Sequence, residues 1–331
     1  MTASSARALG IDVGGTKLAA AVVAGDGRVL SRHQVPTPDT ADGEAVFAAV
    51  CTAADTALRA ADHDAVGHDA AGHDAALGPG VAGIGVATAG PVDTPAGTVS
   101  PVNIGAWRDF PLRDRLAERY GLDVRMFGDG IAMVIAEHWL GAARGADNVL
   151  GMVVSTGVGG GLIQGGRVVL GAGGNAGHIG HMSVDPTGPD CACGGVGCLE
   201  AIASGTSLAR WFAEQHGAGS AARPTAADVA AAARAGDRLA LAAFERSAAA
   251  IGLAVAGVVT LLDLQRVVIG GGVARAFDLL AEPMGAAYRR YAALDYARRP
   301  RIARAMLDGD VGVLGAAAVV LHPDRYWPLA G

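Results

Sequence analysis

The sequence has few aromatic side chains, which make up only 5% of its 331 residues, and only four cysteines. So few large rings exclude a core that depends on bulky aromatic packing. The chain has instead 50 glycines, which indicate many tight loops and close approaches between backbone segments. Loops of this kind often bind phosphate groups. Hydrophobic residues are 51% of the chain, so we expect two domains with ample cores.

Signals for secretion, membrane insertion and nucleic-acid binding are also missing. The segment Met1–Arg7 has no basic region followed by an apolar stretch, so we expect a cytoplasmic protein with reduced thiols. The longest apolar stretches, such as Ile251–Leu262, are short and interrupted by glycine, so we expect no membrane span. The net charge is −6 and the basic residues are scattered, so no nucleic-acid partner is expected. One local run is most simply a solvated face: Arg298, Arg299, Arg301 and Arg304.

Three of the four cysteines lie within eight residues of one another and follow a histidine. The four side chains form a His-x9-Cys-x-Cys-x4-Cys pattern: His181, Cys191, Cys193 and Cys198. Such ligands suit a tetrahedral structural zinc site, and the glycines among them supply tight turns. A disulfide is the alternative, but a Cys-x-Cys pair is too close to bridge comfortably. We therefore predict a bound zinc ion with no open coordination position.

Strands and helices alternate along the chain, which predicts an α/β protein. This alternation begins twice with a strand and a glycine-rich hairpin, which suggests two related halves. The segment Asp62–Gly80 repeats Gly-His-Asp-Ala and is expected to be a solvated loop. We expect strands at Ala8–Val13, Lys17–Ala24, Arg28–Val35, Val81–Thr88, Asp123–Phe127, Asn148–Ser155 and, as the last strand, Gln265–Ile269. We expect helices at Glu44–Ala61, Pro111–Tyr120, Ile131–Leu140, most of Ala201–Leu262, and Gly312–Leu321.

Three glycine-rich loops follow predicted strands. The first, Asp12–Lys17, lies between two strands, so it fits neither a Rossmann nor a Walker loop. Its glycines let backbone amides approach phosphate, and Asp12 can hold magnesium through water. A plain hairpin turn explains this loop equally well by itself. The second loop, Ser155–Gly161, repeats the design and Gly270–Gly272 adds a third, so we expect nucleotide binding.

The order of these motifs resembles the sugar kinases of the actin-like ATPase superfamily, and the cysteine loop narrows the resemblance to the ROK family of repressors and kinases. The resemblance extends over nearly the whole chain. The motifs are Asp12-Val-Gly-Gly-Thr-Lys17, Ser155-Thr-Gly-Val-Gly-Gly-Gly161, Ala176-Gly-His-Ile-Gly-His181, Cys191-x-Cys-Gly-x-x-Gly-Cys-x-Glu200 and Gly270-Gly-Gly-Val273. The resemblance implies a two-domain, RNase H-like fold, with 1–129 plus 311–331 as the small domain, 130–310 as the large one and a zinc loop at 177–200. It also implies a homodimer, ATP with Mg²⁺, and a hexose or N-acetylhexosamine as substrate.

Phosphoryl transfer to a sugar needs a carboxylate within hydrogen-bond reach of the accepting hydroxyl. Asp129 is the candidate general base, because it lies at a strand-to-helix corner where similar kinases place their catalytic aspartate. The alternative role of Asp129 is a helix N-cap. The residues that resemblance assigns to ATP and magnesium are Asp12, Gly14, Gly15, Thr16, Lys17, Thr156, Gly157, Gly159, Gly160, Gly271 and Gly272. Those assigned to the sugar are Gly90, Asn103, Gly128, His178, His181 and Glu200.

Two of these positions depart from related kinases. Gly128 replaces the usual asparagine before the catalytic aspartate, so a sugar-binding side chain is missing. His178 stands where glucose-specific relatives have glutamate, and this is similar to bacterial N-acetylmannosamine kinases. A neutral imidazole tolerates an N-acetyl group where a carboxylate demands a hydroxyl donor. Asn103 can also be an ordinary turn residue, and the change at His178 can be drift among polar residues.

The expected reaction is therefore ATP-dependent phosphorylation of N-acetyl-D-mannosamine at its 6-hydroxyl. Phosphorylation of glucose is the alternative within the same class. A sugar-binding sensor without catalysis is a further alternative, because Gly128 removes a contact. A repressor of the same family would need a helix-turn-helix domain, for which the sequence leaves no room before the first glycine loop.

Overall fold

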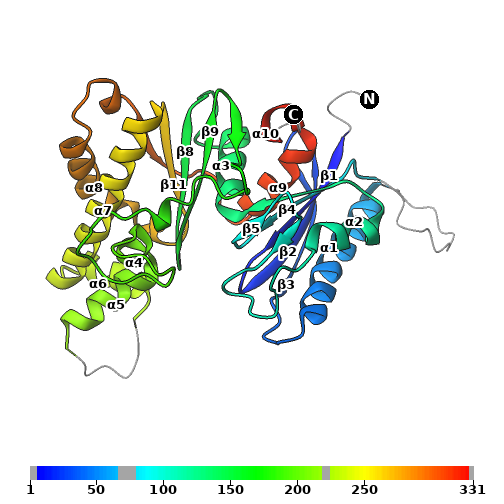
Figure 1. Cartoon of the computed structure of the whole chain (residues 1–331), viewed down its shortest axis with the longest axis horizontal. Coiled ribbons are helices and arrows are strands. Elements are labelled where there is room, and N and C mark those ends of the chain that lie inside the picture. Colours follow the sequence, from blue (N-terminus) through cyan, green and yellow to red (C-terminus); the bar gives the residue numbers. More distant parts are fainter. Residues whose placement is uncertain (1–5, 66–79, 218–223, 328–331) are drawn as a thin grey trace. The chain divides into compact units, whose positions relative to one another are not determined.

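The computed structural model describes residues 6–65, 80–217 and 224–327 (Figure 1). The repeats at Gly67 and Gly72 and most of the Met1–Arg7 segment lie outside the described residues. The chain divides into two compact units. The first comprises Met1–Arg144, Gly166–Ala176 and Leu307–Gly331, and the second comprises Gly145–Gly165 and Gly177–Met306. These boundaries differ from the expected 129/130 and 310/311, because helix α3 (Asp129–Leu140) packs against α9 (Val311–Leu321) within the first unit.

The first unit is built on a five-stranded sheet of order β3-β2-β1-β4-β7. Three of its strands form an antiparallel meander, and the other two extend it in parallel: β1 (Arg7–Val13), β2 (Lys17–Ala24), β3 (Val29–Pro36), β4 (Ile84–Thr88) and β7 (Val124–Gly128). A second small sheet pairs β5 (Val92–Asp93) with β6 (Thr98–Val99). The carboxyl ends of β1, β4 and β7 thus lie at one edge of the main sheet.

Helices cover both faces of this sheet (Figure 1). Leu9, Ile11 and Val13 alternate along β1 and pack with α1 (Gly43–Ala65) and α2 (Leu112–Tyr120). The intervening residues face α9, which approaches very closely: a methyl group on Gly10 would lie 2.1 Å from the Val313 carbonyl oxygen, and one on Gly85 would lie 1.7 Å from that of Ala316. Glycine and alanine on these strands therefore replace bulky side chains in the core.

A buried carboxylate secures the end of α3. Glu137 has no exposed surface, and its two oxygens accept hydrogen bonds from the amides of Ala142, at 2.6 Å, and Leu307, at 2.7 Å. A methyl group on Gly141 would lie 2.1 Å from a Glu137 oxygen. Glu137 thus joins two segments of the first unit that are far apart in sequence.

The second unit has its own sheet, in which four strands follow the order β9-β8-β11-β12. The strands are β8 (Val149–Val154), β9 (Val158–Gln164), β11 (Arg266–Gly270) and β12 (Arg301–Arg304). The next strand after β9, β10 (Arg167–Val169), is grouped with the first unit. The helices are α4 (Leu199–Ala203), α5 (Gly205–Gln215), α6 (Ala226–Arg234), α7 (Arg238–Leu262) and α8 (Phe277–Tyr291), with 3₁₀ turns at Ile179–His181, Val273–Ala276 and Tyr296–Arg298.

Local signals explain where several of these helices begin. Thr225 and Asp228 form a capping box at the start of α6, and the Asp237 carboxylate accepts two amides at the start of α7. Ser204 caps α5 through the amide of Ser207. Side-chain oxygens of this kind satisfy amides that the first turn of a helix leaves without partners.

Several sequence expectations need correction. Gln265–Ile269 is not the last strand, because β12 pairs with it in parallel and carries Arg301 and Arg304 as exposed residues. Helix α3 begins at Asp129 rather than Ile131, because Gly128, which is extended, already serves as its N-cap. Strand β4 begins at Ile84, three residues later than expected, and α1 continues into the expected loop as far as Ala65.

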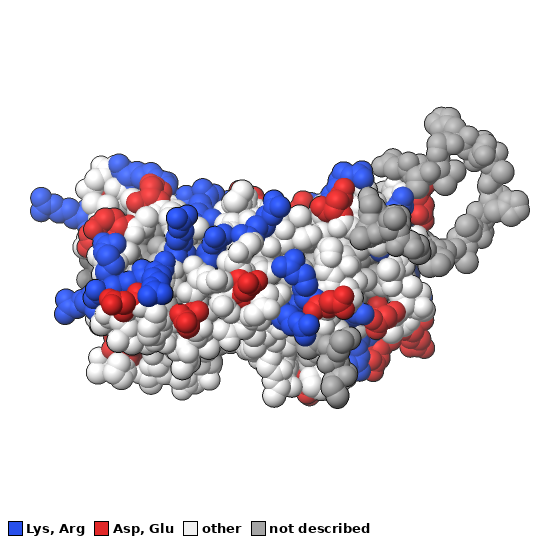
Figure 2. Space-filling model, turned by 90° about the horizontal axis from the view of Figure 1, so that it is seen from above, with Lys and Arg blue, Asp and Glu red and all other residues white. Residues whose placement is uncertain are grey.

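Among the described residues one helix, α7, is long and apolar enough to cross a membrane by length and composition, although 61% of its apolar window is buried inside the protein. Its buried residues belong to the core of the second unit, as in many core helices. On the face drawn in Figure 2, Lys and Arg side chains are interspersed with Asp and Glu. The mixture agrees with the scattered charges of the sequence.

Candidate active site

Strand register in the first unit brings the two predicted aspartates to one edge of the sheet. Val13 of β1 is the partner of Thr88 of β4, and Thr88 is the partner of Gly128 of β7. Asp12 therefore lies one residue before this row and Asp129 one residue after it. Parallel strands end together at one edge, so residues far apart in sequence become neighbours there.

The first glycine loop is the tight turn between β1 and β2. The Gly14 amide donates to the Lys17 carbonyl oxygen at 3.0 Å, and the Thr37 hydroxyl donates to the Gly14 carbonyl oxygen at 2.7 Å. The Asn103 side chain lies against the same turn: its Nδ2 would be only 2.3 Å from a methyl group added to Gly15. Thr16 at its tip is exposed. The turn is thus held from two sides and presents backbone amides that can approach a phosphate group.

The Asp12 carboxyl group has an unusual environment. Burial and the nearby charge of Asp129 raise the pKa of Asp12 to about 6, against the opposing effects of Lys17 and Arg32. Gly312 at the start of α9 makes this position possible, since a methyl group there would lie 2.3 Å from Asp12 Oδ2. Two carboxyl groups placed close together are a common basis for binding a divalent cation.

Asp129 itself is exposed at the first turn of α3, and its Oδ1 accepts the Gly130 amide at 2.7 Å. The residue before it, Gly128, has φ −70° and ψ 147°, which any amino acid adopts. A methyl group on Gly128 would meet nothing within 4 Å. The space that an asparagine side chain would use therefore remains open beside Asp129. Gly90, the third predicted sugar residue near this edge, follows β4, and its carbonyl oxygen accepts the Val102 amide at 3.3 Å.

In the second unit the second glycine loop is shorter than predicted. Only Ser155, Thr156 and Gly157 form the turn, whereas Gly159, Gly160 and Gly161 are part of β9 and pair with β8. Glycine in β9 lets neighbouring backbone segments lie close to the strand: a methyl group on Gly160 would lie 2.8 Å from the carbonyl oxygens of both Gly151 and Gly177. Of the residues of this loop predicted to bind nucleotide, Thr156 and Gly157 therefore lie in the turn, whereas Gly159 and Gly160 lie in a strand.

The third glycine bend lies next to this turn. Gly271 has φ +92°, and a methyl group there would lie 2.4 Å from the Val154 carbonyl oxygen. Gly272 follows it at the wall of a hollow of about 1550 Å³ that Ser155, Thr156 and residues of α5 and α6 also line. The lining of the hollow includes three arginines and a histidine, Arg210, Arg234, Arg275 and His216, together with two acidic residues, Glu214 and Asp237.

Arg210 approaches Glu214 only at 4.0 Å, and Arg234 is paired with Asp278 at 2.7 Å. His216 lies 3.5 Å from Asp237. Among the ion pairs of the described residues, none involves Arg275. Arg210 is only weakly paired. Positive charge beside a glycine-rich turn favours an anionic ligand such as a nucleotide.

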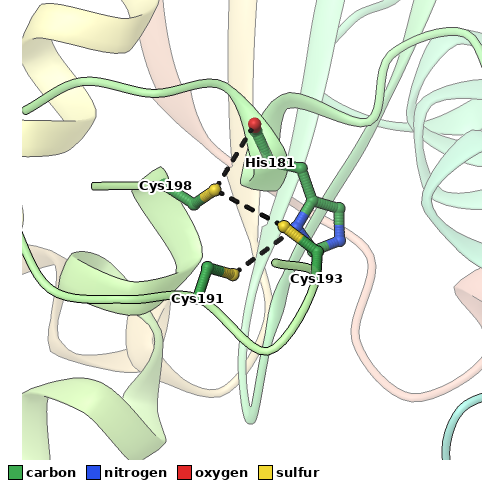
Figure 3. Close-up of side chains that lie close together, drawn as sticks. All are labelled: His181, Cys191, Cys193 and Cys198. Carbon is green, nitrogen blue, oxygen red and sulfur yellow. Dashed lines mark hydrogen bonds between the residues drawn. The ribbon is translucent and has the colours of Figure 1, made fainter. Parts of the chain in front are cut away.

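The cysteine cluster of the second unit has the geometry of a tetrahedral metal site (Figure 3). Its four ligand atoms lie within 4.8 Å of one another. Cys193 Sγ is 3.7 Å from Cys198 Sγ, and Cys191 Sγ is 3.9 Å from His181 Nδ1. Zinc–sulfur bonds of about 2.3 Å in a tetrahedron require sulfur atoms roughly 3.8 Å apart, so the residues fit a structural zinc ion. All four cysteines of the chain are free thiols, which contradicts a disulfide.

The predicted sugar residues of the second unit lie on the loop that carries these ligands. The rings of His178 and His181 are stacked, with centroids 5.8 Å apart, and His178 is exposed. Glu200 follows Cys198 by two residues and lies in the first turn of α4. Gly180 fixes the 3₁₀ turn between the histidines against β9, since a methyl group there would lie 1.9 Å from the Val158 carbonyl oxygen.

Two contributors were not predicted from the sequence. Gly312 leaves room for Asp12, and the glycine repeat at Gly312 and Gly315 could have indicated a helix packed closely on the sheet. The Val158 amide is bound by Glu200 at 2.8 Å, and no sequence pattern indicates that contact.

Residues 8–322 match the ROK family. The chain is 33% identical to a glucokinase of Thermotoga maritima, over 94% of this chain and 96% of that protein. It is 36% identical to an N-acetylmannosamine kinase of Citrobacter koseri, over 93% and 97%. The solved structure of a ROK family glucokinase from Streptomyces griseus in complex with glucose and AMPPNP has a TM-score of 0.76 and 33% identity, covering 95% of this chain and 98% of that one.

These comparisons confirm the predicted family and the predicted sugar-kinase fold. The predicted class of enzyme, an ATP-dependent sugar kinase, is the class that the names of these relatives give. The names divide between glucose and N-acetylmannosamine. With the match running from the first strand to the end of α9, the chain belongs to the ROK family.

Proposed function

We propose that this protein is an ATP-dependent kinase that phosphorylates N-acetyl-D-mannosamine at its 6-hydroxyl. The observation that carries the kinase activity is the pair of carboxyl groups, Asp12 and Asp129, at one edge of the first sheet beside the Gly14–Lys17 turn. Relatives in the same family are named sugar kinases. The acceptor is proposed from the exposed His178, since an imidazole, unlike a carboxylate, does not demand a hydroxyl donor where an N-acetyl group would lie.

In the proposed reaction, Asp129 accepts the proton of the 6-hydroxyl as its oxygen attacks the γ-phosphorus of ATP. A new bond forms between the sugar oxygen and phosphorus, and the bond between the γ-phosphorus and the bridging oxygen of ADP breaks. Asp12 would hold magnesium, which would neutralise charge on the phosphates, and Thr16 and Lys17 would contact phosphate. The other nucleotide contacts come from Thr156, Gly157, Gly271 and Gly272 beside the hollow that Arg275 lines.

Zinc would be held by His181, Cys191, Cys193 and Cys198, where it has a structural role because four protein ligands complete its coordination. The ion would fix the loop on which His178, His181 and Glu200 lie. The proposed sugar contacts of the first unit are Gly90, Asn103 and Gly128.

The experiment is product identification after incubation with ATP, Mg²⁺ and a panel of hexoses and N-acetylhexosamines. We expect N-acetylmannosamine 6-phosphate to form fastest. Faster turnover of glucose would make the protein a glucokinase, which the name of the Thermotoga maritima relative favours. Sugar binding in a calorimeter without turnover of any sugar would indicate a sensor instead.

The matched variant is Asp129→Asn, which keeps the size and the hydrogen-bonding oxygen of the side chain but cannot accept the proton. We expect it to fold, to retain zinc and to lose nearly all turnover. Turnover like that of the wild type would remove Asp129 from the role of base.

A further inference from the structure

The Glu200 carboxylate contacts the glycine turn of the second unit. Its Oε2 accepts a hydrogen bond from the Val158 amide at 2.8 Å, directly after Gly157. Glu200 is only partly exposed, so this bond is partly shielded from water. A carboxylate that accepts a backbone amide makes one of the stronger hydrogen bonds in proteins.

The fit between Glu200 and Gly157 is specific. A methyl group on Gly157 would lie 2.5 Å from Glu200 Oε2 and 3.3 Å from its Cδ, and the three nearest atoms all belong to Glu200. The φ of Gly157 lies outside the left-handed region, so the backbone itself does not require glycine. Glycine at this position is therefore explained by the approach of the carboxylate.

The rest of the turn is held by the start of α5. The Gly205 amide donates to the Ser155 carbonyl oxygen at 2.7 Å, and the Thr206 hydroxyl donates to the Thr156 carbonyl oxygen at 3.0 Å. Glu200 is thus the one side-chain anion among the described partners of Ser155–Val158, and it binds the end of the turn that the α5 contacts do not reach.

Glu200 is in turn fixed by its own surroundings. The Ser207 hydroxyl donates to the Glu200 carbonyl oxygen at 3.0 Å, and the neighbouring Leu199 amide donates to the Met182 carbonyl oxygen at 2.9 Å. Cys198, a member of the metal cluster, is the N-cap of the same helix. The cysteine loop therefore determines where the Glu200 carboxylate lies.

We propose that Glu200 is a positioning residue for the nucleotide: it holds the Ser155–Gly157 turn in the conformation that binds phosphate. The role is separate from any contact of Glu200 with the sugar, and it depends on the proposed function only in that this turn binds a nucleotide. Without the carboxylate the turn must be ordered when the nucleotide binds, and that ordering reduces affinity.

The test measures binding of a non-hydrolysable ATP analogue with Mg²⁺ by calorimetry, in the absence of sugar. We expect Glu200→Ala to raise the dissociation constant about tenfold, as a lost charged hydrogen bond would. We expect Glu200→Gln to stay within about threefold of the wild type, since its amide oxygen can still accept the Val158 amide. A residue that only contacts sugar would leave all three dissociation constants equal, and that result would overturn the proposal.

A double-mutant cycle with Gly157→Ala tests the same contact from the other side. The added methyl group would displace the carboxylate, so we expect it to weaken analogue binding in the wild-type background and to have little effect in Glu200→Ala. Equal losses in both backgrounds would contradict the proposal. A wild-type protein that binds no analogue would contradict the kinase function itself, whereas equal binding by the wild type and Glu200→Ala would contradict only the role of Glu200.

Discussion

The carboxyl groups of Asp12 and Asp129, 117 positions apart in the chain, are close enough in the first unit for the charge of Asp129 to raise the pKa of Asp12. Burial is the larger cause, and together they bring this pKa from its ordinary 3.8 to about 6. A carboxyl group in this state is half protonated near pH 6 and is fully available to magnesium only above it. In the proposed function, the pair would therefore make magnesium binding depend on pH.

The first prediction concerns stability. Between about pH 4 and pH 6 the folded protein binds more protons at Asp12 than the unfolded chain does, so this group's contribution to stability falls as the pH rises. We expect the unfolding temperature of the wild type, relative to that of Asp12→Asn, to decrease across this window and to level off above it. Thermal unfolding at several pH values measures the difference. A difference independent of pH would show that Asp12 titrates normally.

The same pair predicts a shift of magnesium binding with pH. Asp129→Asn removes the charge that raises the pKa of Asp12, so the pH at which Mg²⁺–nucleotide affinity falls should move downward. Binding of an ATP analogue, with and without Mg²⁺, measures it in a variant that need not turn over. An unchanged pH profile would mean that Asp129 does not influence the metal position.

Gly128→Asn should be tolerated and should strengthen sugar binding. The backbone there suits any residue, a side chain would meet nothing within 4 Å at its first atom, and asparagine is a better N-cap than glycine by a few tenths of a kcal/mol. A restored hydrogen bond of about 1 to 3 kcal/mol would lower the sugar KM roughly 5- to 150-fold. Gly85→Ala is the contrasting variant, since its methyl group would lie 1.7 Å from a carbonyl oxygen, and it should fold poorly. An unchanged KM in Gly128→Asn would show that the open space lies outside the sugar site.

His178→Glu should move the preference toward glucose. The side chain is exposed, so the change should not disturb the fold, while a carboxylate would favour a hydroxyl donor over an N-acetyl group. We expect the ratio of kcat/KM for glucose to that for N-acetylmannosamine to rise about tenfold or more, a difference of about 1.4 kcal/mol in transition-state binding. His178→Gln, which stays neutral, is the control and should keep the original preference. Equal ratios in all three proteins would assign the specificity to other residues.

Removal of zinc should weaken the binding of both the nucleotide and the sugar. Cys198 is the residue at the N-cap position of the helix that carries Glu200, so loss of the metal should loosen the Glu200–Val158 contact as well as the loop of His178. Metal analysis should find about one zinc per chain in the wild type and in Cys51→Ala, whose cysteine lies outside the cluster, and little in Cys198→Ser. A chelator should also lower the unfolding temperature of the wild type. Full zinc content in Cys198→Ser would exclude this ligand.

Most strands and helices could be predicted because their signals are local. The first hairpin, β7 and α9 are all mostly apolar, and the bounds of β2 were predicted to the residue. Strand β12 was missed because an exposed, arginine-rich edge strand has no apolar alternation. The extent of the second glycine loop was wrong, because glycine marks both turns and close approaches inside a strand.

The sequence alone determined the ligand types and their spacing: the His and Cys cluster within one short loop, the glycine turns after strands, and an aspartate at a strand-to-helix corner. These features are local, so residue type and spacing suffice to specify them. Only the tertiary structure decided which distant groups meet: Asp12 with Asp129 through strand register, Glu137 with Leu307, and Glu200 with the amide of Val158. Such contacts depend on how sheets pair and how closely helices pack on glycine, which no local pattern specifies.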